Sequence, residues 1–448
     1  MREKQLTTPT IRRAEIIAAF SYALDLTEGQ PAGHSVRSCW IGMNVAKALG
    51  LSAIELADLY YVLLLKDLGC SSNAARICEL YDADDRAFKQ GYKTVGTSLA
   101  STLHFVFSRT ARGRPLGQRA AAIGNILRNG DRIAQELIVS RCTRGADIAR
   151  TLGFSEAVCE GIYRLDEHWN GGGRPGRLRG AAIPTASQIA LLAQVVDVFH
   201  GHAGPLAALD EARRRSGSWF DPALVRALEA AAAQPSFWPT LSSSLVEGRV
   251  VRMAPEEAAA RHVDEDALDA IADAFGQVID AKSPYTAGHS RRVGDLSLAM
   301  AGHLGSPAAR GRWLRRAAVL HDIGKLGVSS AILEKPASLD EREWQEMRGH
   351  AAHTRAILSR IGALSDLADV AAAHHERLDG TGYPLSLEAA AIGRETRIIT
   401  ACDFYDALTS DRPYRSALPR EEALRIMERS VGTALDGECF EALKASVA

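Results

Sequence analysis

The sequence has few of the features that mark secreted, thiolate-metal or membrane proteins. Its seven cysteines are scattered along 448 residues, and none forms a CxxC pair. Their odd number and spacing argue against a disulfide framework and against a cysteine zinc site. The first ten residues lack the apolar stretch of a signal peptide, and the longest apolar runs, such as 189–199, are too short to span a bilayer. We therefore expect a soluble, cytoplasmic protein without membrane insertion.

An excess of charge of one sign is also missing. The formal net charge is −1, with 24% charged residues, which gives no general attraction for a nucleic acid polymer. Strand-like alternation of Val, Ile and Thr is scarce. Segments such as 266–281 and 421–431 instead place apolar residues at three- and four-residue steps. The sequence predicts an all-α protein.

The chain contains an internal repeat. AGHSVR at 32–37 matches AGHSRRV at 287–293, an offset of 255 positions. The same offset places LLKDLGC at 64–70 on VLHDIGK at 319–325. Two matches in one register favour a duplicated module over convergent helical composition.

Further along, the N-terminal copy carries about 46 extra residues, and the offset falls to 209. There LDEHWNGGGRP at 165–175 matches HHERLDGTGYP at 374–384. A stretch rich in Pro, Ser and Gly separates the copies. We predict two tandem helical modules at 10–245 and 263–448, joined by a linker at 246–262.

The C-terminal copy gathers imidazole and carboxylate side chains on apolar helix faces. His321, for example, follows Leu314 and Ala317 at helical spacing, so we expect its side chain on the core-facing stripe. A lone buried histidine is more often a hydrogen-bonded core residue than a ligand, but burying many titratable groups without a cation is costly. The residues in this pattern are His289, His321, Asp322, His350, His374, His375 and Asp403.

This ligand set indicates the kind of metal site. Mixed nitrogen and oxygen ligands without thiolate suit divalent Fe, Mn, Zn or similar ions. Seven ligands exceed what one tetrahedral site takes, which favours a two-metal centre.

The motifs His321-Asp322 and Gly324-Lys325, followed by HHERLDGTGYP, resemble the HD-GYP domain of the HD phosphohydrolase superfamily from about Asp264 to the C-terminus. The resemblance implies two tandem HD-domain helical bundles, of which the second hydrolyses a cyclic dinucleotide with two divalent metals, commonly iron or manganese. It favours cyclic di-GMP as substrate, cleaved to linear pGpG and by some members on to GMP. Cyclic GMP-AMP is the nearest alternative. The implied mechanism is activation of a water that bridges the two metals.

The resemblance also implies roles for individual residues. The seven residues above would bind the metals, Asp322 as a bridging, catalytic ligand, and Asp406 would orient ligands from behind. Lys325 would be catalytic by stabilising charge that develops at phosphorus. Substrate binding would involve Lys325, Gly382, Tyr383, Pro384, Arg412 and Arg415. Three-metal members have a glutamate where this chain has Tyr285, so we expect two metals.

The N-terminal copy departs from the pattern. His34, Asp67 and Asp197 match three of the ligands, with Asp197 placed against Asp403. The other positions are occupied by Lys66, Cys70, Arg141, Leu165, Asp166 and, in the GYP triplet, Arg174. A lysine or arginine repels a divalent ion and can pair with the remaining carboxylates. We therefore predict a non-catalytic, structural or regulatory module; a pocket that binds a nucleotide without cutting it is the alternative.

Two other functions remain as alternatives. A regulatory or scaffold protein would act through partners such as a diguanylate cyclase or another signalling protein, but it would not need seven ligands and Lys325. A nucleoside phosphohydrolase of the wider superfamily fits the GYP loop and DRPYR poorly. The sequence leaves the oligomeric state open, a homodimer included.

Overall fold

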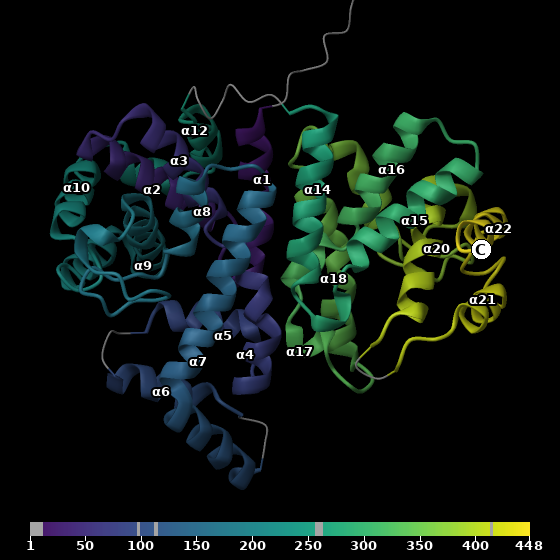
Figure 1. Ribbon diagram of the computed structural model, residues 1–448, viewed down its shortest axis with the longest axis horizontal. Coiled ribbons are helices and arrows are strands. Elements are labelled where there is room, and N and C mark those ends of the chain that lie inside the picture. The colour runs from purple at the N-terminus through teal and green to yellow at the C-terminus, as the bar shows by residue number, and fades with distance from the viewer. Residues whose placement is uncertain (1–11, 96–98, 112–114, 256–262, 413–414) are drawn as a thin grey trace, which may run out of the picture. The chain divides into compact units, whose positions relative to one another are not determined.

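The computed structural model describes residues 12–95, 99–111, 115–255, 263–412 and 415–448. These residues form α-helices and short 3-10 helices and no β-strand (Figure 1). The predicted all-α fold is confirmed. No helix in this part of the chain is long and apolar enough to cross a membrane.

The helices belong to two compact units, and each unit is made of three separate stretches of the sequence. The first unit contains Met1–Cys70, Gln90–Thr102 and Ile126–Leu268. The second unit contains Ser71–Lys89, Leu103–Asn125 and Asp269–Ala448. Two stretches from the N-terminal half of the sequence are therefore part of the second unit.

In the first unit, α2 is the central helix. It packs against α1, α3, α9, α10 and α12. The helices of this unit are α1 (Arg13–Thr27), α2 (His34–Leu49), α3 (Ala53–Leu65), α8 (Glu156–Tyr163), α9 (Thr185–Arg214), α10 (Pro222–Ala232), α11 (Phe237–Leu241) and α12 (Val246–Arg252). The start of the predicted linker thus forms α12, with Val246 and Val250 buried; its residues 256–262 lie outside the described residues.

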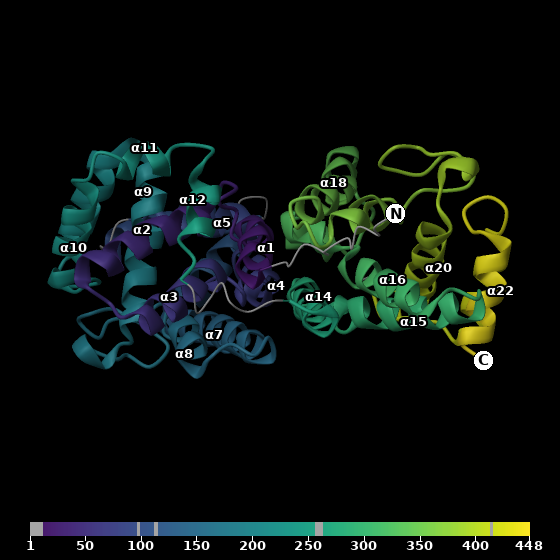
Figure 2. The same ribbon diagram turned by 90° about the horizontal axis from the view of Figure 1, so that it is seen from above.

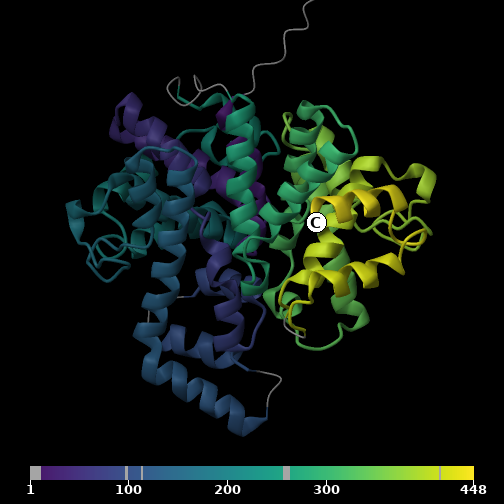
Figure 3. The same ribbon diagram turned by 45° about the vertical axis from the view of Figure 1, so that its right-hand side comes forward.

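In the second unit, α15 lies beside α16 and also packs against α20 and α22 (Figures 1 and 2). Figure 3 brings the yellow C-terminal helices α21 and α22 forward. The helices are α4 (Ala74–Tyr81), α15 (His289–His303), α16 (Ala308–Leu320), α17 (Ser330–Leu333), α18 (Glu341–Leu358), α19 (Ala368–Ala372), α20 (Arg394–Thr409), α21 (Arg420–Glu428) and α22 (Gly437–Ser446).

The remaining helices are of two kinds. Some contain residues of both units, and the others are short 3-10 turns. The crossing helices are α5 (Asp85–Lys93), α6 (Leu99–Arg109), α7 (Leu116–Thr151) and α14 (Glu265–Asp280). The 3-10 turns are η1 (Cys70–Asn73), η2 (Gly180–Ala182), η3 (Pro284–Thr286), η4 (Ile323–Gly327), η5 (Ser365–Leu367) and η6 (Ala389–Ala391).

Local sequence signals account for many of these helices. The helix α14 buries Ile271, Phe275 and Val278, which recur at three- and four-residue steps. The helix α18 begins with a capping box, in which Asp340 accepts from the amide of Glu343 and the Glu343 carboxylate accepts from the amide of Asp340. Such a box satisfies two amides that have no partner inside the helix.

The two units repeat the same backbone arrangement around their HD motifs. Gly324 lies against α18, where an added Cβ would be 1.9 Å from the carbonyl oxygen of His350. Gly69 lies in the same way, 1.9 Å from the carbonyl oxygen of Arg141. Gly69 matches Gly324 at the offset of 255, and Arg141 matches His350 at the offset of 209. In both units the turn needs a glycine because a side chain would meet the backbone of the neighbouring helix.

We predict that Gly69→Ala destabilises the first unit, by about 1–3 kcal/mol in free energy of unfolding, because the new methyl group meets rigid backbone. Thermal and urea unfolding followed by circular dichroism measures this. The matched control is Gly130→Ala in α7, where no described heavy atom lies within 4 Å of the new methyl group and stability should rise by up to about 1 kcal/mol. Equal stability of the two variants would contradict a close backbone contact at Gly69.

Candidate metal centre

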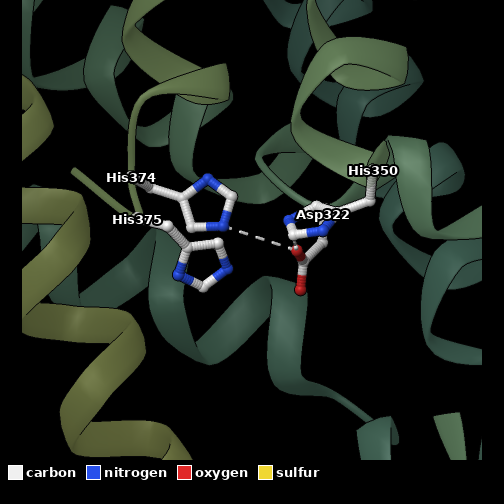
Figure 4. Close-up of side chains that lie close together, drawn as sticks. All are labelled: Asp322, His350, His374 and His375. Atoms are coloured by element: carbon white, nitrogen blue, oxygen red, sulfur yellow. Dashed lines mark ion pairs between the residues drawn. The ribbon is translucent and has the colours of Figure 1, made fainter. Parts of the chain in front are cut away.

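The seven residues predicted as metal ligands meet in one place in the second unit. His289, His350 and Asp403 lie in α15, α18 and α20, whereas the other four lie in the turns that follow α16 and α19: His321, Asp322, His374 and His375. The possible ligand atoms of the seven residues form overlapping groups within 4.8 Å: Asp322, His350, His374 and His375; His289, His321 and Asp322; His321, His374 and Asp403. Figure 4 shows the first group, in which His374 and Asp322 face each other. The first two of these groups share Asp322, so this carboxylate lies at the centre of the cluster.

Backbone carbonyl groups orient three of the imidazole rings. Nδ1 of His321 lies 2.6 Å from the carbonyl oxygen of Ala318, three residues earlier. His350 and His374 repeat this contact, 2.6 and 2.7 Å from the carbonyls three residues before them. In the neutral form of each ring the carbonyl accepts from Nδ1–H, so that Nε2, which is directed toward the cluster, is the atom that can bind a metal.

His289 is held by a carboxylate instead. Its Nδ1 lies 2.7 Å from Asp406, and Arg292 donates to both oxygens of the same carboxylate at 2.5 and 3.0 Å. Nε2 of His289 lies 3.5 Å from Asp322 and 3.5 Å from Asp403. Asp406 therefore contacts a predicted ligand from the side away from the cluster, where the sequence had placed it.

Burial and charge set the protonation of the cluster without metals. Burial lowers the pKa of His350 to about 4 and that of His374 to about 3. Burial opposes protonation of His289 too, but hydrogen bonds to Asp322 and Asp406 outweigh it and raise the pKa to about 9. Burial would raise the pKa of Asp322, yet His321 and Lys325 hold it well below its ordinary value. Neutral imidazoles and ionised carboxylates are the forms that bind metals, so His350, His374 and Asp322 are already in that form, whereas His289 would have to lose a proton.

Unpartnered polar atoms show that the cluster fits a cation. Among the described residues, Nε2 of His350, Nε2 of His374 and Oδ1 of Asp322 are buried without a hydrogen bond. Each nitrogen is 3.6 Å from that oxygen. Buried polar atoms are normally satisfied, and a group of them facing one point calls for an ion between them. The donor set of imidazole and carboxylate suits divalent iron, manganese or zinc.

A cleft of about 600 Å³ opens beside the cluster. Its lining includes Asp322, Lys325 and Arg412, and Nζ of Lys325 lies 2.5 Å from the Asp322 carboxylate. Tyr285, at the position of the third-metal glutamate, is also in the wall and is 37% exposed. The cleft thus places two cationic side chains, Lys325 and Arg412, next to the buried cluster.

The other predicted substrate residues lie in two different settings. The ring of Tyr383 lies 4.7 Å from that of His375, and Gly382 fits against the His375 carbonyl, where a Cβ would be 2.6 Å away. The triplet therefore packs on the histidine cluster, with Pro384 after a cis peptide bond. Arg415, in contrast, donates to the carbonyls of Ala407, Leu408 and Ser416.

The first unit has cations at the corresponding place. Lys66 forms an ion pair with Asp67, both buried, and Cys70 lies 3.5 Å from the same carboxylate. Glu28, Asp67 and Cys70 could be grouped as metal ligands by distance alone. Lys93, however, is 2.8 Å from Glu28, and the two lysines already balance these carboxylates.

A second ion pair in the first unit joins residues at two further ligand positions. Arg141, at the position of His350, pairs with Asp166, at the position of His375. Burial opposes the charge of Arg141, but surrounding anionic groups raise its pKa. The predicted pairing of these basic residues with carboxylates is observed, although Arg141 takes Asp166 rather than Asp67 or Asp197.

The match of Asp197 with Asp403 is wrong. Asp197 lies 2.7 Å from Nδ1 of His34 and accepts from Arg37 at 2.7 and 3.1 Å. Asp406 makes these contacts in the second unit, so Asp197 is its equivalent and Gln194 stands at the position of Asp403. The offset of 209 applies without a further shift. The arginine was missed, although both AGHS motifs carry it three residues after the histidine.

Comparison with known proteins agrees with this geometry. A family model described as an HD domain matches residues 121–224 and 273–439. The chain belongs to the HD-domain family. Its HD domains fall in both halves of the sequence, and the predicted relation to HD-GYP proteins is confirmed by a relative from Vibrio cholerae named 3′3′-cGAMP-specific phosphodiesterase 3. That relative is 52% identical over 97% of this chain and 94% of its own length.

Two further matches are informative. The crystal structure of a cyclic GMP-AMP specific phosphodiesterase of V. cholerae (V-cGAP3) superposes with a TM-score of 0.67 at 46% identity and covers 98% of each chain. A cyclic di-GMP phosphodiesterase from Thermotoga maritima is 36% identical over 40% of this chain and 49% of its own length. The first of these matches therefore extends over nearly the whole chain, and the second over 40% of it.

We predict that Mn²⁺ or anaerobic Fe²⁺ binds at about two ions per chain and raises the melting temperature, by an amount equivalent to about 2.7 kcal/mol at a hundred times Kd. Elemental analysis and thermal unfolding measure both. Asp322→Ala should remove the bound metal and the shift, because it deletes the shared ligand. Asp67→Ala is the matched control and should leave the stoichiometry unchanged. Four ions per chain would contradict a metal-free first unit.

Proposed function

We propose that this chain is a metal-dependent phosphodiesterase of cyclic dinucleotides and that 3′,3′-cyclic GMP-AMP is its preferred substrate. The observation that carries the reaction is the buried histidine–aspartate cluster, with Lys325 between it and a cleft of about 600 Å³. The base preference rests on the relative that matches 97% of the chain, which is named for cyclic GMP-AMP. Cyclic di-GMP, favoured by the resemblance to the HD-GYP family, is the competing substrate.

The seven residues of the cluster would hold the metals. Bound divalent ions supply Lewis acidity, which lowers the pKa of a water molecule and neutralises phosphodiester oxygens. The chain's own groups do the rest. Lys325 presents an ammonium group at the mouth of the cluster, and Arg412 lines the same cleft with a planar guanidinium that can bind a phosphate through two hydrogen bonds. Because the Arg415 guanidinium already donates to three carbonyls, we assign it to holding the Arg412 loop.

The cleft also offers aromatic surface for bases. Tyr285 and Trp344 both line it and are 37% and 41% exposed. Exposed rings beside cationic groups favour a ligand that carries both a phosphate and a nucleobase, because bases stack on aromatic faces. The cleft therefore suits a nucleotide better than a simple phosphate ester.

The first unit is proposed to be non-catalytic and structural or regulatory, because lysine and arginine stand at two ligand positions. The residue boundaries of the modules, a homodimer and a diguanylate cyclase partner stay predictions.

We predict that the purified chain, loaded with Mn²⁺ or anaerobic Fe²⁺, linearises cyclic GMP-AMP about tenfold more efficiently than cyclic di-GMP. Chromatography of the products gives kcat/KM for each. Lys325→Ala should lower kcat by about 10²- to 10³-fold, because it removes a cation from the developing charge. Lys444→Ala on α22 is the control and should leave kcat unchanged. No hydrolysis of either dinucleotide at full metal occupancy would contradict the proposed function.

A further inference from the structure

A buried ion pair lies beneath the wall of the cleft in the second unit. Nζ of Lys282 is 2.8 Å from the carboxylate of Asp85, and the two residues are 1% and 0% exposed. The other oxygen of Asp85 accepts a hydrogen bond of 2.9 Å from the amide of Ser330. Asp85 is thus bound to two separate segments of the C-terminal half of the sequence, although it begins α5 in the N-terminal half.

The next residue makes a second set of contacts in the same unit. Arg86 donates to the carbonyl oxygen of Gly327 and pairs with Glu346 at 2.6 Å. The same oxygen of Glu346 accepts from the amide of Ser329 at 3.1 Å. Two consecutive residues therefore hold both ends of the segment 327–330.

These held segments adjoin or line the cleft. The segment 327–330 follows Lys325 in the turn η4, and Ile332, shortly after it, lines the cleft. Lys282 lines it too, directly before Ser283 and the turn η3. Because the ammonium group of Lys282 is directed to Asp85, its contribution to the wall is its alkyl chain.

Removing the carboxylate would change this wall. Burial lowers the pKa of Lys282 and Asp85 opposes that effect, while Lys282 in turn lowers the pKa of Asp85 against burial. A single buried charge left without its partner is strongly unfavourable, whereas replacing both charges by neutral groups can be nearly neutral. Loss of Asp85 alone should drive the Lys282 segment toward water and release Ser330.

We propose that Asp85 and Arg86 are positioning residues of the catalytic cleft, so that the functional catalytic unit consists of the C-terminal HD domain together with Ser71–Lys89 from the N-terminal half of the sequence. The inference rests on the proposed function for its kinetic readout, but not for its structural one. A catalytic module that begins at residue 263 would lack the partner of its own buried lysine.

The kinetic test compares variants of the full-length, metal-loaded chain. Asp85→Asn should raise KM about tenfold while about two metal ions stay bound, because the cleft wall loosens and the ligand cluster does not. Combining Asp85→Asn with Lys282→Met should return KM to within about twofold of the unmodified chain, because no uncompensated charge remains. Glu79→Gln, which removes an exposed ion pair with Arg76 in the same stretch, is the matched control and should not change KM.

A structural readout separates this inference from the proposed function. Hydrogen–deuterium exchange of the Asp85→Asn variant should be faster in peptides covering 282–286 and 327–333 and unchanged in α22. Should Asp85→Asn fail to fold, Arg86→Met gives the same comparison, with faster exchange at 327–330 alone. Unchanged exchange at these segments, or a double variant no better than Asp85→Asn, overturns the inference. If the unmodified chain cleaves no cyclic dinucleotide, the proposed function fails, and exchange alone decides the role of Asp85.

Discussion

The central constraint on this structure is the burial of Asp322. This carboxylate is 1% exposed, and a charge so far from water must be balanced by positive charge nearby. Burial lowers the pKa of three surrounding imidazoles, those of His350, His374 and His375, and so keeps them neutral. Without metals, Lys325 and His289 therefore supply the balance. Asp67 is buried equally well in the first unit, and there Lys66 and Lys93 balance it and its neighbour Glu28. Two copies of one fold thus solve the same electrostatic problem differently. In the described part of the first unit lysines pair with the buried carboxylates, whereas in the second buried imidazole nitrogens face Asp322 without a hydrogen bond.

A polar framework behind the ligand cluster explains why the first unit keeps its shape. In each unit an aspartate accepts from the amide and hydroxyl of a serine: Asp25 with Ser35, and Asp280 with Ser290. In each unit, too, a carboxylate beside α2 or α15 binds a histidine and an arginine. Glutamates at the equivalent positions 167 and 376 accept two amides of the following loop. These hydrogen bonds involve no metal, so the ligands could be replaced while the framework stayed satisfied.

The sequence predicted the all-helical fold and the members of the ligand cluster because both follow from local patterns. Helical periodicity places His321 and Asp403 on buried faces, and the repeat fixes which residues correspond. The sequence could not predict that Arg415 donates to backbone carbonyls, because these contacts depend on where the end of α20 lies. It also matched Asp197 to the wrong aspartate, since two aspartates three residues apart share one face of a helix. Contacts such as Asp85–Lys282 join positions 197 apart in the sequence and leave no periodic signal at all.

The same contact bears on why a module with lysine and arginine at two ligand positions remains in the chain. The offset between the copies changes between the LLKDLGC and LDEHWNGGGRP motifs, so the extra residues of the first copy lie in this interval. Ser71–Lys89 and Leu103–Asn125, which belong to the second unit, lie in the same interval. An insertion that served only its own module could be lost together with that module's metals. One that supplies Asp85 to a buried lysine of the catalytic unit cannot, because its removal leaves Lys282 uncompensated. The N-terminal half of the sequence can therefore be needed by the catalytic unit even where it has replaced metal ligands, because it supplies Asp85.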